Sequence, residues 1–263
     1  MIPKDYITEW REHAPWVQDA QVEQDLVISR ALVEIFSVPE LEQRLAFRGG
    51  TALFKLHLRP AARYSEDIDL VQITGGPIGD TFDALRAVLD SWLGTPRRVI
   101  KEDRVNLVYR FQSEGEPARP MRLKIEINSR EHFSEHEHVR HPFEVRSRWW
   151  GGGADIRTFT LEELLSTKMR ALYQRKKGRD LFDLWFALQH GADPARITAC
   201  FARYMREAGH RVTRAQFERN LTAKIEDTVF IADMTPLLRA GAAWDLHEAA
   251  AVVSAELLAR LPE

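Results

Sequence analysis

Two segments of the sequence alternate apolar and polar residues with a period of two, and this alternation constrains the fold most strongly. They are VNLVYRFQ, residues Val105–Gln112, and MRLKIEIN, residues Met121–Asn128. Such alternation predicts half-buried β-strands, because successive side chains of a strand point to opposite faces of a sheet. A sheet with one apolar face is therefore expected in the first part of the chain.

Segments with helical spacing lie around these strands. Apolar residues recur at roughly helical intervals in residues Asp19–Phe36, and the segments GGTALFKLHL, from Gly49, and TFDALRAVLDSWL, residues 81–93, are also predicted helices. The first ~150 residues are thus expected to combine helices with a mixed sheet.

The second part of the chain has a different pattern. The segment from about Glu131 to Gly153 lacks periodicity, is rich in charge and histidine, and is predicted to be a connection. Thr160 and Glu163 have the spacing of a capping box at the start of a predicted helix that runs on towards residue 190, and the remainder has helical spacing. We therefore expect an α+β fold with two domains: residues 1–155, with a mixed β-sheet flanked by helices, and residues 156–263, a helical domain.

Composition limits the kinds of partner and the cellular compartment expected for the protein. The formal net charge is −2, so binding to a polyanion would have to rely on a local patch. The single cysteine, Cys200, excludes an internal disulfide, fits a reducing compartment and is expected in the core. We find no signal-peptide pattern and no apolar stretch of about 18 residues, which favours a cytoplasmic protein without a membrane partner.

The stretch SEDIDLV places two aspartates on the polar side of a predicted strand. Ile68 and Leu70 would face the core, so that Asp67 and Asp69 would both face a cleft. Two neighbouring carboxylates repel each other, and protonation of one or a bound cation such as Mg²⁺ or Mn²⁺ relieves the repulsion. The alternative is a solvated strand end, because such short patterns often occur by chance.

Two other features support a site near these aspartates. Glu126 lies on the polar face of its predicted strand and could complete a two-metal clamp and accept a proton, or it could simply pair with a Lys or Arg across the sheet. Gly49, Gly50 and Thr51 open a helix whose backbone N–H groups could approach a phosphate, although a plain turn is the alternative.

A basic segment follows in the predicted helical domain. Lys168, Arg175 and Arg179 would share one stripe if the helix continues through Gly178, and such a stripe could bind a triphosphate or simply be solvated. A zinc site is not expected in HFSEHEHVRH, residues 132–141, because its histidines lack metalloprotease spacing; a surface loop is predicted instead. If RNA binds, C-terminal arginines are candidate contacts, namely Arg203, Arg206, Arg211 and Arg214.

The segments RGGTALFKLHL, RYSEDIDL, the strand carrying Glu126 and LLSTKMRALYQRKKGRDLFDLW together resemble the bacterial abortive-infection nucleotidyltransferase-like toxins of the AbiEii and MenT group. This group looks like the DNA polymerase β nucleotidyltransferase superfamily, and the resemblance extends from about Arg48 to Trp185. It implies a nucleotidyltransferase domain with a mixed sheet, joined to a helical domain that contributes nucleotide-binding residues.

The resemblance also implies roles for individual residues. It implies metal ligands and catalytic acids at Asp67, Asp69 and Glu126. It implies nucleotide or phosphate contacts at Gly49, Gly50, Thr51, Ser65, Lys168, Arg175, Arg179, Asp180 and Asp183, with Lys168 also catalytic. The sequence departs from the superfamily in the long gap between Gly50 and Asp67, which is normal for this toxin group, and in having Glu126 where an aspartate is more usual.

The function implied is that of a metal-dependent toxin that transfers nucleotides from NTP to an RNA acceptor, the tRNA 3′ end, and so blocks translation. A cognate antitoxin protein would be its partner. Two alternatives are a small-molecule, antibiotic-modifying nucleotidyltransferase with the same metal site and a non-catalytic nucleotide- or RNA-binding regulator. The regulator is disfavoured because the acids and the lysine are all present.

Overall fold

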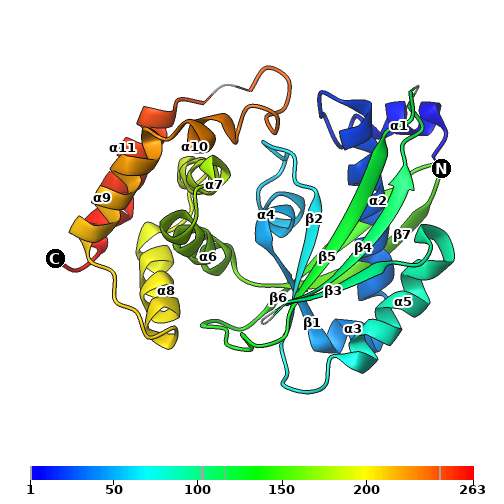
Figure 1. Cartoon of the computed structure of the whole chain (residues 1–263), viewed down its shortest axis with the longest axis horizontal. Helices are drawn as coiled ribbons and strands as arrows, with labels where there is room; N and C mark the ends of the chain where they lie inside the picture. Colours follow the sequence, from blue (N-terminus) through cyan, green and yellow to red (C-terminus); the bar gives the residue numbers. More distant parts are fainter. Residues whose placement is uncertain (1, 102–103, 116, 243) are drawn as a thin grey trace. The chain divides into compact units, whose positions relative to one another are not determined.

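The computed structural model describes residues 2–101, 104–115, 117–242 and 244–263. It divides into two compact units, Met1–Phe159 and Thr160–Glu263 (Figure 1). The expected α+β fold class is confirmed, because the first unit carries a seven-stranded mixed sheet with helices and the second consists of helices in its described part. The sequence predicts a domain boundary near residue 155, and the structure divides into its two compact units between Phe159 and Thr160.

The sheet of the first unit has the strand order β3-β4-β5-β2-β1-β7-β6. Its strands are β1 Leu45–Arg48, β2 Asp67–Gln72, β3 Arg97–Lys101, β4 Arg104–Gln112, β5 Pro120–Asn128, β6 Val139–Arg146 and β7 Gly151–Thr158. Strand β2 pairs in parallel with β5 and antiparallel with β1, while β4 pairs antiparallel with both β3 and β5. The two strands predicted from alternation are confirmed as β4 and β5.

The helices of the first unit are α1 Lys4–Trp10, α2 Asp19–Phe36, α3 Pro39–Arg44, α4 Gly49–Ala52, the π-helical turn Leu53–His57 and α5 Gly79–Leu93. Of these, α2 and α5 pack against the apolar face of the sheet (Figure 1). The prediction for α2 is confirmed at both ends; this helix is largely buried and contacts β2, β5, β6 and β7. Because α2 and α5 bury the apolar side chains of the strands, the polar side chains of β2 and β5 lie on the opposite face.

The prediction of a connection between about Glu131 and Gly153 is wrong. Strand β6 and the start of β7 occupy much of this segment and form an antiparallel pair. Their pattern is obscured because β6 is an edge strand that contains Pro142, which is tolerated where one side of the strand needs no backbone partner. His141, expected in a surface loop, instead lies on β6 with its ring 4.5 Å from that of His57.

The second unit consists of helices in its described residues. They are α6 Leu161–Gln174, α7 Gly178–Gln189, α8 Pro194–Glu207, α9 Arg214–Ile225, α10 Thr228–Ala232, α11 Leu246–Glu256 and the 3₁₀ turn Leu258–Arg260. Thr160 caps α6, since its side chain accepts a hydrogen bond from the backbone N–H of Glu163 (3.4 Å). Cys200 is buried, as expected. In the described part of the chain, no helix combines the length and apolarity needed to cross a membrane.

The prediction of one helix through Gly178 is also wrong. Helix α6 ends at Gln174, Arg175 adopts an extended conformation, and α7 begins at Gly178. A Cβ atom at Gly178 would lie 2.4 Å from the carbonyl oxygen of Phe230, so α7 begins where a long-range backbone contact admits only glycine. The stripe of three cations on one helix therefore does not form.

Candidate active site

Three carboxylates lie on adjoining strands of the open sheet face. Asp67 and Asp69 are on β2 and Glu126 is on β5, where the parallel register places Glu126 opposite Asp69 and Lys124 opposite Asp67. Between the two aspartates, Ile68 is fully buried on the other face of the sheet. Alternation along two paired strands is thus sufficient to bring the three acids to one face.

The negative charge of this group is only partly compensated. Burial raises the pKa of Asp69, and the nearby carboxylates of Glu126 and Asp67 raise it further, against the opposing effect of Arg48 and Lys124. Burial also raises the pKa of Asp67, although Lys124 lowers it. Raised carboxylate pKa values mean that a cation would be stabilised here.

Lys124 is a site residue to which the sequence analysis gave no role. Its Nζ lies 2.8 Å from Asp67 Oδ2 and 3.5 Å from Glu126 Oε2. Burial lowers the pKa of Lys124, but the hydrogen bond to Asp67 and the attraction of the carboxylates outweigh burial, so the pKa is raised overall. The available signal was its place on the polar face of the strand, two residues before Glu126.

The glycine turn packs directly against the acids. Gly49 has a φ of +82°, and a Cβ atom there would lie 2.2 Å from Asp69 Oδ2. At Gly50 a Cβ atom would lie 2.5 Å from Nη2 of Arg63, a residue that is 1% exposed. Both glycines are therefore required by close contacts, and the first also by its left-handed backbone.

Thr51 and Ser65 connect this turn to β2. Thr51 Oγ1 donates a hydrogen bond to the carbonyl oxygen of Asp67 (2.6 Å) and lies 2.8 Å from Ser65 Oγ. The start of α4, the acidic strand and Ser65 are consequently held together. The seven candidate residues of the first unit thus lie in one neighbourhood: Gly49, Gly50, Thr51, Ser65, Asp67, Asp69 and Glu126.

In the second unit, four candidates form one ion-pair network. Lys168 is buried, with Nζ 2.9 Å from Asp183 Oδ2 and 3.3 Å from Asp180 Oδ1. Arg175 donates two hydrogen bonds to Asp180, at 2.7 and 2.8 Å. The side chains of Asp180 and Asp183 are fully buried and that of Lys168 nearly so, whereas the Arg175 side chain remains half exposed.

Arg179 is held by a different acid. Its guanidinium donates two hydrogen bonds to Asp233, both at 2.9 Å. Burial would raise the pKa of Asp233, but the side-chain and backbone hydrogen bonds from Arg179 hold it at about 2. The sequence analysis missed Asp233 because it lies 54 residues further along the chain, where no motif marks it.

The oxygen donors of the first unit fit a divalent metal ion in their chemistry. Carboxylates are the ligands that Mg²⁺ and Mn²⁺ prefer, and Gly49 leaves room beside Asp69 that a side chain would fill. Within the described ranges, however, no three His, Cys, Asp or Glu side chains are placed so that they could hold a metal ion together. The cation that contacts Asp67 here is the ammonium group of Lys124.

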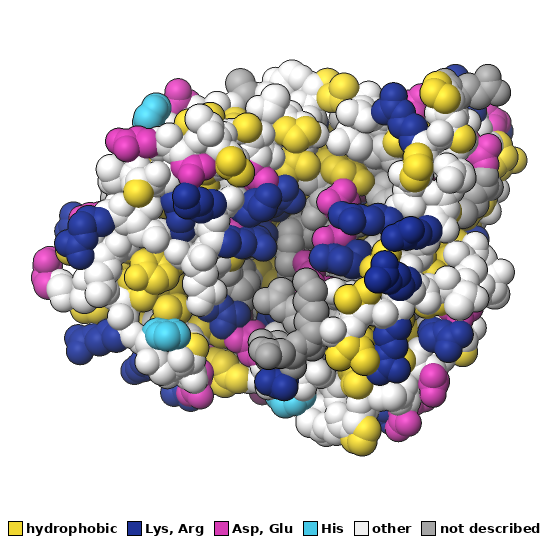
Figure 2. Space-filling view, viewed as in Figure 1, with side chains coloured by type: hydrophobic (Ala, Val, Ile, Leu, Met, Phe, Trp, Pro, Cys, Tyr) yellow, Lys and Arg dark blue, Asp and Glu magenta, His cyan; other side chains and the backbone are white. Residues whose placement is uncertain are grey.

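Exposed arginines extend the open sheet face beyond the acids. Arg110 on β4 is paired in register with Arg122 on β5. Arg97 on β3 is paired with Val108 on β4, and Val108 is itself paired with Lys124 on β5. All three arginine side chains are exposed. Figure 2 shows Lys and Arg side chains gathered over these strands next to acidic ones. This part of the surface is therefore basic although the net charge of the chain is close to zero.

The comparisons with known proteins identify the family of the chain. The family model described as nucleotidyl transferase AbiEii toxin, type IV TA system, matches residues 30–252. The chain belongs to the AbiEii toxin family. As an AbiEii protein it is a nucleotidyltransferase of the toxin–antitoxin type, which confirms the resemblance inferred from its motifs. No curated protein matches the chain.

Solved structures share the fold of this AbiEii protein. MenT4, a nucleotidyltransferase toxin from Mycobacterium tuberculosis, superposes with a TM-score of 0.69 at 16% identity, covering 99% of this chain and 91% of that one. A putative nucleotidyltransferase from Helicobacter pylori superposes with a TM-score of 0.60 at 17% identity, covering 91% of this chain and 94% of that one. JHP933 from the same organism superposes with a TM-score of 0.57 at 18% identity, covering 91% of this chain and 90% of that one.

Proposed function

We propose that this AbiEii protein transfers nucleotides from an NTP to an RNA acceptor, the 3′ end of tRNA, and thereby blocks translation. The observation that carries the proposal is the group formed by Asp67, Asp69 and Glu126, with the glycine turn packed against Asp69. Partly compensated carboxylates beside a helix start supply the two features that phosphoryl transfer requires, a cation site and a phosphate site.

Each unit has its own proposed nucleotide-binding residues. The backbone N–H groups at Gly49, Gly50 and Thr51, with the hydroxyl of Ser65, bind phosphate oxygens. In the second unit the proposed nucleotide-binding residues are Lys168, Arg175, Arg179, Asp180 and Asp183. Lys168 provides the cation, and the two buried aspartates hold its ammonium group in a fixed position.

The chemical step is an in-line displacement at the α-phosphorus of the NTP. The oxygen of the acceptor hydroxyl forms a bond to phosphorus, the bond from phosphorus to the bridging oxygen of the β-phosphate breaks, and pyrophosphate leaves. The hydroxyl proton passes to a carboxylate oxygen of Glu126. Asp67, Asp69 and Glu126 would hold a Mg²⁺ or Mn²⁺ ion, which when bound would supply positive charge for the attacking and leaving oxygens.

The basic sheet face supports a polyanionic acceptor. A small cationic drug as acceptor would require an acidic surface next to the site, whereas the strands beside the acids expose Arg97, Arg110 and Arg122. Of the C-terminal arginines, Arg203 and Arg214 form ion pairs with Glu207 and Glu218 (2.9 and 2.7 Å). These pairs leave less of their charge available for RNA, so the sheet face is the stronger candidate.

The proposal extends to the setting of the reaction. The protein acts in the cytoplasm, where NTP and tRNA occur together, and a cognate antitoxin protein counteracts it. Membership of a toxin–antitoxin family supports the antitoxin partner.

The proposal is tested by incubating the purified protein with α-labelled NTPs, total RNA and Mg²⁺, then separating the RNA. Label in tRNA is the expected result, with no label when EDTA is present and recovery when excess Mg²⁺ or Mn²⁺ is added. Label only in an added aminoglycoside would favour the drug-modifying alternative. NTP binding without transfer to any acceptor would favour a regulator.

A further inference from the structure

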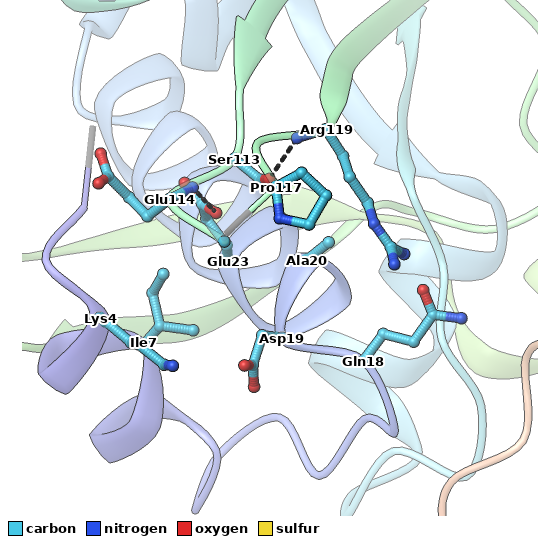
Figure 3. Close-up of a pocket in the computed structure, with 11 residues that line it drawn as sticks. Lys4, Ile7, Gln18, Asp19, Ala20, Glu23, Ser113, Glu114, Pro117 and Arg119 are labelled. Atoms are coloured by element: carbon cyan, nitrogen blue, oxygen red, sulfur yellow. Dashed lines mark hydrogen bonds between the residues drawn. The ribbon is translucent and has the colours of Figure 1, made fainter.

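A cavity lies in the first unit, between α1, the start of α2 and the turn that joins β4 to β5. It has a volume of about 410 Å³, and the residues that line it are distinct from the three acids and the glycine turn. Figure 3 shows Glu23 at the back of this cavity beneath Ser113 and Pro117, with Lys4 and Arg119 on opposite sides. We call it the Glu23 pocket.

One buried oxygen in this pocket has no hydrogen-bond donor. Glu23 is 1% exposed, and its Oε2 accepts a hydrogen bond from the backbone N–H of Glu114 (3.1 Å). Its Oε1 is buried and has no partner in the described part of the chain. A buried carboxylate oxygen without a donor is costly, and it is a position where a ligand that brings a donor is stabilised.

The other charged groups of the pocket do not supply this donor. Asp19 is paired with Arg11 on the solvent side. Lys4 and Arg119 are exposed, and in the ranges described neither side chain forms a hydrogen bond or ion pair with Glu23. Arg119 donates its backbone N–H to Ser113 Oγ (2.9 Å). Burial raises the pKa of Glu23 to about 7 even though the positive charge of the chain's N-terminal amino group lowers it, so the ionised form is only partly stabilised by the chain itself.

We propose that the Glu23 pocket binds a primary alkylammonium group, which donates a hydrogen bond to Oε1 of Glu23 while its methylene stem packs against Ile7 and Ala20. An ammonium group fits better than a guanidinium because only one carboxylate oxygen is available, whereas a guanidinium fork is matched by two. The same chemistry is presented by a lysine side chain of a partner protein and by a free polyamine.

Binding should depend on pH in a defined direction. Because the cation requires the ionised carboxylate, affinity should increase as the pH rises from 6 to 8, through the pKa of Glu23 near 7. The charged groups around Glu23 are the chain's N-terminal amino group, which lowers its pKa, Lys4 on α1, Asp19 on α2, and Glu114 and Arg119 on the turn between β4 and β5.

The test is a titration of the full chain with n-butylamine at pH 6, 7 and 8, followed by saturation-transfer NMR. We expect Glu23→Gln to weaken binding at least ~10-fold and to abolish its pH dependence. The matched control is Glu12→Gln, which changes an exposed glutamate outside the pocket and should have no effect. Circular dichroism verifies folding, and Ala20→Leu, which leaves Glu23 intact but occupies the path of the stem, should also weaken binding.

Three results would overturn the proposal: unchanged affinity in Glu23→Gln, stronger binding of butyrate than of butylamine, or no butylamine binding at roughly 10 mM. Two further probes distinguish the sources. Tighter binding of spermidine than of Nα-acetyl-lysine amide indicates a polyamine, and the reverse order indicates a lysine side chain. The readout does not depend on nucleotide transfer, so its failure is separate from failure of the proposed function.

Discussion

The two units each contain a group of closely spaced charges, but they balance these charges differently. In the second unit, Lys168 and Arg175 form ion pairs with the fully buried Asp180 and Asp183. Each buried acid therefore has a cation within ion-pair distance. Such pairs fix side chains in one arrangement, because removing either partner leaves a buried charge without compensation.

The first unit retains an excess of negative charge. Asp67, Asp69 and Glu126 lie on one sheet face, and Lys124 forms ion pairs with two of them. Burial and mutual repulsion raise the pKa of Asp69, which shows that the group is not balanced. The difference indicates that the first group is suited to binding a cation and the second to holding Lys168 and its helices in position.

Asp69→Asn should have the largest effect on activity. We expect nucleotide transfer to fall roughly 10⁴-fold, about 5.5 kcal/mol in barrier height, because a proposed metal ligand is lost. The free energy of unfolding should stay equal or increase, since one of three repelling charges is removed. Labelled NTP transfer and urea denaturation measure the two quantities. The control is Asp83→Asn, which changes an exposed aspartate on α5. Full transfer and growth arrest by the Asp69→Asn variant would refute the metal-dependent mechanism.

Asp183→Asn should show the opposite pattern. The free energy of unfolding should fall by about 4 kcal/mol, because the ammonium group of Lys168 loses its nearest carboxylate in a buried position. Urea denaturation followed by circular dichroism measures the change. The double variant Lys168→Met/Asp183→Leu should regain much of the stability, and transfer by this folded variant then reports the role of Lys168. Wild-type stability in Asp183→Asn would mean that the network is not structural.

Gly49→Ala tests whether the left-handed backbone at Gly49 and its contact with Asp69 matter for stability and for transfer. We expect a loss of about 1–2 kcal/mol in stability from the positive φ and, in addition, a loss of transfer because the Cβ atom displaces Asp69. Gly94→Ala is the matched control: Gly94 also has a positive φ, of +77°, but no heavy atom within 4 Å of its Cβ position. Equal transfer by the two variants would show that the contact between the glycine turn and Asp69 does not contribute to activity.

Arg122→Gln should have the smallest effect. We expect RNA affinity to fall several-fold and the salt dependence of binding to decrease by about one unit of slope, since one phosphate contact is lost. Fluorescence anisotropy with tRNA at several salt concentrations measures both. Arg98→Gln is the control, because Arg98 packs over Phe82 of α5, 4.6 Å from its ring centroid. An equal effect of the two variants would show that RNA does not follow the open sheet face.

The sequence by itself determined those features that depend on local periodicity. Helix α2 and strands β4 and β5 were predicted because their apolar residues recur at helical or strand spacing over many residues. The same alternation placed Asp67 and Asp69 on one side of a strand and Glu126 on the polar side of another. The family followed from motifs that are short and local.

Only the tertiary structure decided which distant groups meet. The start of α7 depends on the contact of Gly178 with the backbone of Phe230, and the opposition of Asp69 to Glu126 depends on the parallel pairing of β2 with β5. The Glu23 pocket arises because a backbone N–H 91 residues away reaches one carboxylate oxygen and not the other. Such contacts join segments with no shared periodicity, so they are fixed by packing in three dimensions and leave no local pattern in the sequence.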